Sequence, residues 1–196
     1  ERAFDAARRQ LEVLAAHLPG SDLLIRRCGL FLFDAPEQAR PCYLAITSED
    51  PGIVALARWH AASLQEEREA AIAELLELVL LLPAEEPAQR ALSRAAAVAE
   101  EARGKNAAVL LLRDTGRALL QARGGAVDDW PPAHRELVAQ AFTMAAQLAA
   151  TPGEALDILK EAGVSTRETR WHDDATILAA RCLRAEGQDA AALPLY

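Results

Sequence analysis

Alanine is the feature of this sequence that most constrains its fold. The chain has 196 residues, and 44 of them are Ala. Ala has the highest helix propensity of all residues, and its small side chain lets neighbouring helices approach closely. Only nine residues are Phe, Trp or Tyr, and no run alternates apolar and polar side chains between turn residues as a β-strand would. The sequence therefore predicts an all-α chain.

Proline and glycine divide the sequence into helices, because Pro suits the first position of a helix and Gly the position just after its end. Asp50-Pro51 predicts one helix start, and Thr151 with Glu154 has the spacing of a capping box in which Glu154 reaches back to the Thr151 amide. Short connections make consecutive helices antiparallel. The helices that we expect cover roughly residues 2–17, 22–33, 36–44, 51–61, 65–82, 87–103, 106–123, 133–150, 152–162, 165–185 and a final segment after Gly187.

Two of these boundaries depend on weaker signals. The apolar run from Leu30 to Phe33 is compatible with a strand, and we interpret it as the end of a buried helix. Ser165 and Glu168 form a second possible capping box, which predicts that the tenth helix begins beside Ser165.

The end of the chain carries the clearest repeat pattern. Small and large residues follow one another there in the order Ala180, Leu183, Gly187, Ala192 and Tyr196. This pattern resembles a tetratricopeptide repeat, in which small residues let two helices approach and large ones fill the space toward the next repeat. Looser copies of the small-to-large step on the second helix occur at Ala155 and Leu159, Ala71 and Leu75, and Ala39 and Tyr43.

The resemblance implies a fold of antiparallel helical hairpins stacked as a right-handed superhelix. Another α-α repeat and a closed helical bundle are the alternatives, because the intervals between the copies scatter around the tetratricopeptide period. We expect one continuous α-solenoid domain over residues 1–196, excised from a longer protein.

The net charge of −8 argues against nucleic acid and anionic membranes as direct partners, because both require clustered Lys and Arg. No apolar run approaches the roughly 20 residues of a membrane-spanning helix. The three cysteines are too few and too scattered for a zinc site or a disulfide framework, and we interpret them as small buried hydrophobes. Cys28 and Cys42 lie on consecutive expected helices, which leaves a disulfide and an oxidising compartment open.

No group of residues has the pattern of a catalytic, cofactor-binding or metal-binding site. His60 has no second ligand at helical spacing, so we interpret it as packing with Trp59. Trp171-His172-Asp173-Asp174 offers an imidazole beside two carboxylates, which is the minimum for a remote all-α enzyme alternative. The same acidic residues also suit the start of a helix.

Four residues are candidates for binding a partner. Trp130 precedes a helix, where it is either a hydrophobic staple or an exposed anchor for a partner. Trp59 is a second aromatic candidate, and Arg181 and Arg184 form one of several near pairs of Arg side chains. In solenoids the concave face often carries such charges.

These observations predict a non-catalytic scaffold that needs no cofactor and binds another protein or a peptide. Similar solenoids occur in bacterial exopolysaccharide export and secretion machines. The alternative is a superhelical sensor module of a large transcription regulator, in which the same face binds a small ligand. The compartment stays open between the cytoplasm and the bacterial periplasm, and the oligomeric state is not predicted.

Overall fold

The computed structural model of the chain describes residues 2–18, 22–123, 129–163 and 167–195. All regular structure in these residues is helical, which confirms the all-α prediction. Contacts group the chain into two compact units, residues 1–91 and 92–196, which are considered separately below. The tetratricopeptide-like superhelix and the single continuous domain stay predictions.

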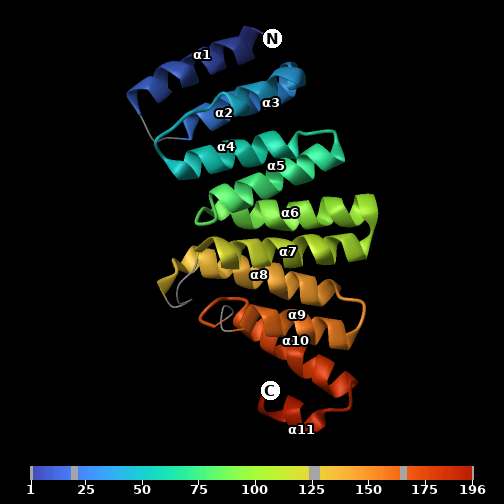
Figure 1. Cartoon of the computed structure of the whole chain (residues 1–196). Coiled ribbons are helices and arrows are strands. Elements are labelled where there is room, and N and C mark those ends of the chain that lie inside the picture. The colour runs from blue at the N-terminus through green and yellow to red at the C-terminus, as the bar shows by residue number, and fades with distance from the viewer. Residues whose placement is uncertain (1, 19–21, 124–128, 164–166, 196) are drawn as a thin grey trace. The chain divides into compact units, whose positions relative to one another are not determined.

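Unit 1 is a series of antiparallel helices, and from α1 to α5 each one packs on the next (Figure 1). The core of this unit includes Tyr43 and Ile53, with small residues such as Ala39, Ala57 and Ala61 between them. The described helices are α1 (Arg2–His17), α2 (Leu23–Asp34), α3 (Pro36–Leu44), α4 (Pro51–Ser63), α5 (Arg68–Leu81) and the start of α6 (Glu86–Arg103).

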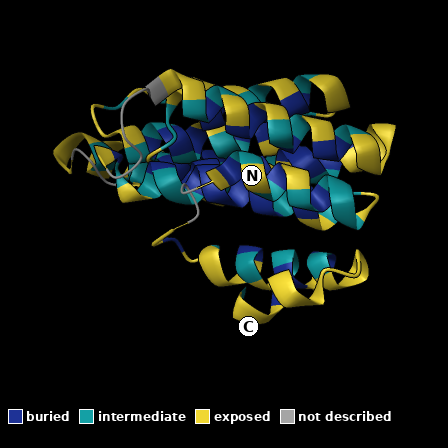
Figure 2. Cartoon of the chain, turned by 60° about the horizontal axis from the view of Figure 1, so that its bottom comes forward, coloured by how far each residue is buried: buried dark blue, intermediate teal, exposed yellow. Residues whose placement is uncertain are grey.

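Unit 2 is centred on α8, which is buried around most of its circumference. Phe142 of α8 lies against Gly116 of α7, where the missing side chain leaves room for the aromatic ring. Buried positions collect on the surfaces where helices meet, and exposed positions on the opposite surfaces (Figure 2). The described elements after α6 are α7 (Lys105–Arg123), α8 (Pro132–Leu148), α9 (Pro152–Ala162), α10 (His172–Ala185), α11 (Asp189–Ala192) and the short 3-10 helix η3 (Leu193–Leu195).

Two of the helix starts that were predicted from capping residues, those of α4 and α9, are found, with one change of partner in α9. Asp50 accepts a hydrogen bond from the Gly52 amide at 2.8 Å, and Thr151 Oγ1 accepts one from the Glu154 amide at 3.2 Å. The Glu154 carboxylate accepts from the Ala150 amide at 2.9 Å and not from Thr151. The capping box therefore reaches one residue further back than the sequence pattern predicts.

Two helix starts lie later than predicted. Helix α5 begins at Arg68 and not near residue 65, because the Glu67 carboxylate caps the amides of Glu69 and Ala70. Helix α10 begins at His172. Glu168 adopts a left-handed backbone conformation with φ of 58°, which is incompatible with the first turn of a helix. Its expected capping partner Ser165 lies outside the described residues.

The prediction that Leu30 to Phe33 end a helix is confirmed, but the prediction that this end is buried is wrong. These residues form the last turns of α2, but Leu32 is exposed and Phe33 is 75% exposed. The Phe33 ring instead stacks on Phe4 of α1, with 5.8 Å between the ring centroids. An aromatic residue at the end of a surface helix can gain contact area in this way without entering the core.

The predicted final segment after Gly187 is a short helical turn. Helix α10 ends in a Schellman motif: the Gln188 amide donates to the Leu183 carbonyl at 2.8 Å and the Gly187 amide to the Arg184 carbonyl at 3.0 Å. Gly187 supplies the positive φ of 73° that the motif requires. Helix α11 covers only four residues before η3 follows.

Candidate functional site

A groove lies between α2 and α3 in unit 1, and it exists because of a tight turn. Ala35 is both the C-cap of α2 and the N-cap of α3, so a single residue separates the two helices. Pro36 has no amide hydrogen to continue α2 and has the φ that suits the first position of α3. The two helices therefore lie antiparallel and side by side.

A disulfide holds these helices together. The structure joins Cys28 of α2 to Cys42 of α3, with 5.4 Å between their Cα atoms. The disulfide that the sequence left open for this pair is therefore present, and the interpretation as a small buried hydrophobe is confirmed for Cys182, which is buried and free. Because a single residue separates α2 from α3, the helix faces that carry Cys28 and Cys42 meet.

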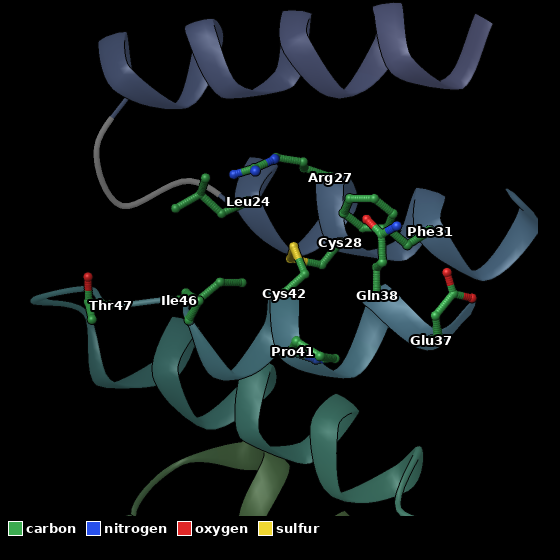
Figure 3. Close-up of a pocket in the computed structure, with 11 residues that line it drawn as sticks. Leu24, Arg27, Cys28, Phe31, Glu37, Gln38, Pro41, Cys42, Ile46 and Thr47 are labelled. Carbon is green, nitrogen blue, oxygen red and sulfur yellow. A yellow bond between two sulfur atoms is a disulfide. The ribbon is translucent and has the colours of Figure 1, made fainter. Parts of the chain in front are cut away.

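The groove has a volume of about 470 Å³ and lies directly over the disulfide (Figure 3). Most of its lining side chains are apolar, and the polar ones include the Gln38 amide, which lies beside the Phe31 ring. Its lining residues are Leu24, Arg27, Cys28 and Phe31 from α2, Glu37, Gln38, Pro41 and Cys42 from α3, and Ala45, Ile46 and Thr47 after it.

The α2 wall is one face of a regular helix. Leu24, Arg27, Cys28 and Phe31 follow the spacing of three and four residues that places side chains on one helix surface. This face is roughly 10 Å long at the helical rise per residue. The groove can therefore hold about three residues of an extended segment or about two turns of a helix.

Phe31 is held in place by α1. The Arg8 guanidinium lies 4.3 Å from the centre of the Phe31 ring, and it forms two hydrogen bonds to the Asp34 carboxylate at 2.7 and 3.0 Å. These bonds are the main reason that the pKa of Asp34 lies below its usual value. The Arg8 and Asp34 side chains are each only 10% exposed, so the pair fixes one wall of the groove.

Arg27 is the only basic residue in the described lining of the groove. Its side chain lies on the side of the groove that faces α1, and its guanidinium points toward the Leu24 end (Figure 3). Nη1 lies 3.5 Å from Glu12 of α1, a carboxylate that is 59% exposed. The Arg27 Nε is buried and has no hydrogen-bond partner among the described residues.

A second polar group marks the opposite end of the groove. Glu37 lies in the first turn of α3, beyond Phe31 in the view of Figure 3. Its side chain is exposed, and the described ion pairs do not include it. The groove is therefore lined mainly by apolar side chains, with a cation along one side, the Gln38 amide beside Phe31 and an anion at one end.

Trp59 belongs to an aromatic cluster on α4 and not to the groove. The His60 ring stacks on Tyr43 with 4.9 Å between centroids, and the Trp59 ring meets it edge-on at 4.9 Å. Burial, and then the charge of Arg90, lowers the pKa of His60. These contacts match the prediction that Trp59 and His60 pack together, and Trp59 keeps a half-exposed surface.

The candidates in unit 2 are dispersed. Trp130 is 6% exposed, and its ring meets His134 edge-on at 5.2 Å, which favours the staple over an exposed anchor. Burial, rather than sequence position, decides between these alternatives. Arg181 and Arg184 are exposed on α10, where Arg184 Nε lies 3.7 Å from the Asp189 carboxylate.

The residues of the repeat pattern lie where helices pack. Ala155, Ala180 and Ala192 are buried, as small residues between close helices should be. Leu159 lines a smaller cavity of about 150 Å³ with Leu195 and residues of α10, and Leu183 is half-buried. Tyr196, the last residue of the pattern, lies outside the described residues.

The described residues do not bring together a set of metal ligands. His172, Asp173 and Asp174 are exposed in the first turn of α10. No group of three His, Cys, Asp or Glu side chains in the described part of the chain is close enough to hold a metal ion. Among the described helices, none combines the length and the apolar character that crossing a membrane requires.

Sequence reasoning missed the groove residues Arg27, Phe31 and Ile46. The signal that could have found them is the pair Cys28 and Cys42 on either side of a Pro-initiated turn, because a disulfide there fixes which faces of the two helices meet. No family model, curated protein or solved structure matches this chain.

Proposed function

We propose that this chain is a non-catalytic helical interaction module that docks a segment of a partner protein in the α2–α3 groove. The groove itself is the observation that carries the proposal: it has a volume of about 470 Å³, and most of its lining residues are apolar, with a small number of polar ones among them. A groove of this kind suits an apolar side chain whose backbone or neighbouring residues meet the polar groups.

The rigidity of the groove supports the same function. The Cys28–Cys42 disulfide joins the two helices that form it, and the Arg8–Asp34 pair supports Phe31 in its wall. A site that is already formed before binding does not need to order its side chains when a partner enters, and this lowers the entropic cost of association. The resemblance to tetratricopeptide solenoids agrees with a scaffold in a larger bacterial assembly such as an export or secretion machine.

The proposal is tested by panning a phage-displayed library of short random peptides on the protein. Recovered peptides are then titrated by fluorescence anisotropy against wild type and against a matched pair of variants. Ile46→Ser places a hydroxyl in the groove, whereas Leu44→Ser makes the same kind of change at an exposed position outside it. We expect binding to weaken for Ile46→Ser only, and equal affinity for both variants contradicts the proposal.

A regulatory sensor that binds a small ligand is the second candidate function. The groove volume of about 470 Å³ lies within the roughly 300–1,000 Å³ of typical small-molecule sites. Native mass spectrometry of the purified protein separates the two functions. A bound small molecule that is lost in Ile46→Ser but kept in Leu44→Ser favours the sensor, and ligand-free protein that binds peptides through Ile46 favours the interaction module.

A further inference from the structure

We infer that the groove recognises a partner segment in which one acidic side chain stands close to an apolar side chain, with the carboxylate bound by Arg27. This inference rests on the proposed function, because it names the chemistry of the segment that the α2–α3 groove docks. Three observations carry it: the incomplete pairing of Arg27, the apolar surface beside it, and the acidic residue at the other end of the groove.

The guanidinium of Arg27 has unused hydrogen-bonding capacity. An Arg side chain presents five N–H donors in a planar fork that matches a carboxylate. The one ion pair described for Arg27 is a 3.5 Å contact to the exposed Glu12, and exposed pairs of this kind contribute little. The buried Nε has no acceptor among the described residues. That nitrogen is closed to solvent, so a carboxylate entering the groove meets the Nη groups of this partly exposed side chain. A charge-assisted hydrogen bond there is stronger than the 3.5 Å contact to Glu12.

The apolar part of the segment is determined by what lies beside Arg27. Leu24 and Ile46 stand at the end of the groove toward which the guanidinium points, the disulfide lies between α2 and α3, and Pro41 lies on the α3 side (Figure 3). An aliphatic or aromatic side chain next to the acidic residue would cover this surface. Water would then be excluded from the Arg27–carboxylate contact, which strengthens it.

Charge limits the number of acidic residues in the segment. Glu37 at the far end of the groove repels a second carboxylate, and the whole chain carries a net charge of −8. A polyacidic tail is therefore disfavoured by its interaction with the protein as a whole. The segment that fits has one acidic residue at the Arg27 position and a neutral or basic residue toward Glu37, which also sets its direction in the groove.

The inference is tested by a charge swap at Arg27. The peptide library is panned in parallel on wild type, Arg27→Gln and Arg27→Glu, with Arg26→Gln as the control. Arg26 is the preceding residue of the same helix, pairs with Asp22 on the exposed side and does not line the groove. Circular dichroism and urea denaturation establish that each variant is folded before it is used.

We expect wild type and Arg26→Gln to enrich peptides with one acidic residue beside an apolar residue. Arg27→Gln should bind these peptides about ten- to a hundredfold more weakly, which is the effect of losing a charge-assisted hydrogen bond. Arg27→Glu should enrich a basic residue at the same place in the peptide. The affinity of these peptides for the wild-type protein should also fall as the salt concentration is raised, and their affinity for Arg27→Gln should fall less.

Other outcomes separate the inference from the proposed function. Peptides that need Ile46 but lack an acidic residue, and bind Arg27→Gln as well as wild type, overturn the inference and leave the docking groove in place. Peptides that bind Ile46→Ser as tightly as wild type, or a library that yields no binder, overturn both. Concentration-dependent dimers that are lost in Ile46→Ser identify a second copy of the chain as the occupant and likewise overturn the inference.

Discussion

Replacing Gly116 with Ala should destabilise unit 2, although Ala normally favours a helix. A Cβ atom at this position would lie 2.8, 3.0 and 3.1 Å from three carbon atoms of the Phe142 ring. Phe142 is fully buried, so the ring has no open space to enter. The change from Gly to Ala in a helix gains about 1 kcal/mol, whereas overpacking a tight core costs about 1–3 kcal/mol.

The net effect should be a loss of about 1–2 kcal/mol, because three contacts at once bring the packing cost toward the upper end of its range. Urea denaturation followed by circular dichroism at the helical minimum measures this as a lower transition midpoint. Gly153→Ala is the matched control, since its new Cβ would meet only Glu186 Oε1, at an ordinary 3.7 Å. That variant should be as stable as wild type or up to about 1 kcal/mol more stable.

A second substitution tests the cause of the loss. Phe142→Leu removes the ring atoms that the new methyl group would meet, so Gly116→Ala should cost less in that background than in wild type. If Gly116→Ala stabilises the protein as much as Gly153→Ala does, helices α7 and α8 are not packed as closely as described. The same conclusion follows if the cost of Gly116→Ala is unchanged by Phe142→Leu.

Three further perturbations should act locally. The Cys28–Cys42 disulfide closes a loop with a sequence separation of 14 residues. Its reduction should lower the unfolding free energy of unit 1 by about 3 kcal/mol and weaken peptide binding. Equal urea midpoints with and without reductant would contradict this. The pKa of Glu161 is lowered to about 2, chiefly by its hydrogen bond from Arg113, so its contribution is complete above about pH 4.5 and is lost as the pH falls toward 2. With the Glu161 side chain 28% exposed, solvent screening reduces that contribution to about 1–2 kcal/mol, and the acid dependence of stability should flatten in Glu161→Gln. Gly187→Ala should cost about 1 kcal/mol, because the Schellman motif needs a positive φ there; a thermal denaturation midpoint equal to that of wild type would argue against the motif.

Helix type and most helix boundaries could be predicted because their determinants are local. Ala content, Pro at first helical positions and Gly187 after α10 act within a few residues of the chain. The misplaced starts of α5 and α10 have the same local origin, but they depend on which of several polar residues becomes the cap. Glu67 caps α5, although Glu is not among the preferred capping residues.

The groove could not be predicted because it depends on which helix faces meet. Arg26 and Arg27 are adjacent and chemically identical, yet only Arg27 lines the groove. The difference is the rotation of α2 about its axis, which the disulfide and the Arg8–Asp34 pair determine through contacts distant in sequence. Burial similarly separates Trp130, which is buried, from Trp59, which is only half-buried.

The central claim is that the α2–α3 groove docks a partner segment. The most direct test is to identify the residues whose NMR signals change when a peptide binds. A peptide recovered by panning on wild type is titrated into isotopically labelled protein, and backbone amide chemical shifts are followed by NMR. We predict that the largest shifts fall on α2, α3 and the residues up to Thr47, and that they vanish in Ile46→Ser but persist in Leu44→Ser. Shifts concentrated on α10 around Arg181 and Arg184, or unchanged in Ile46→Ser, would contradict the claim.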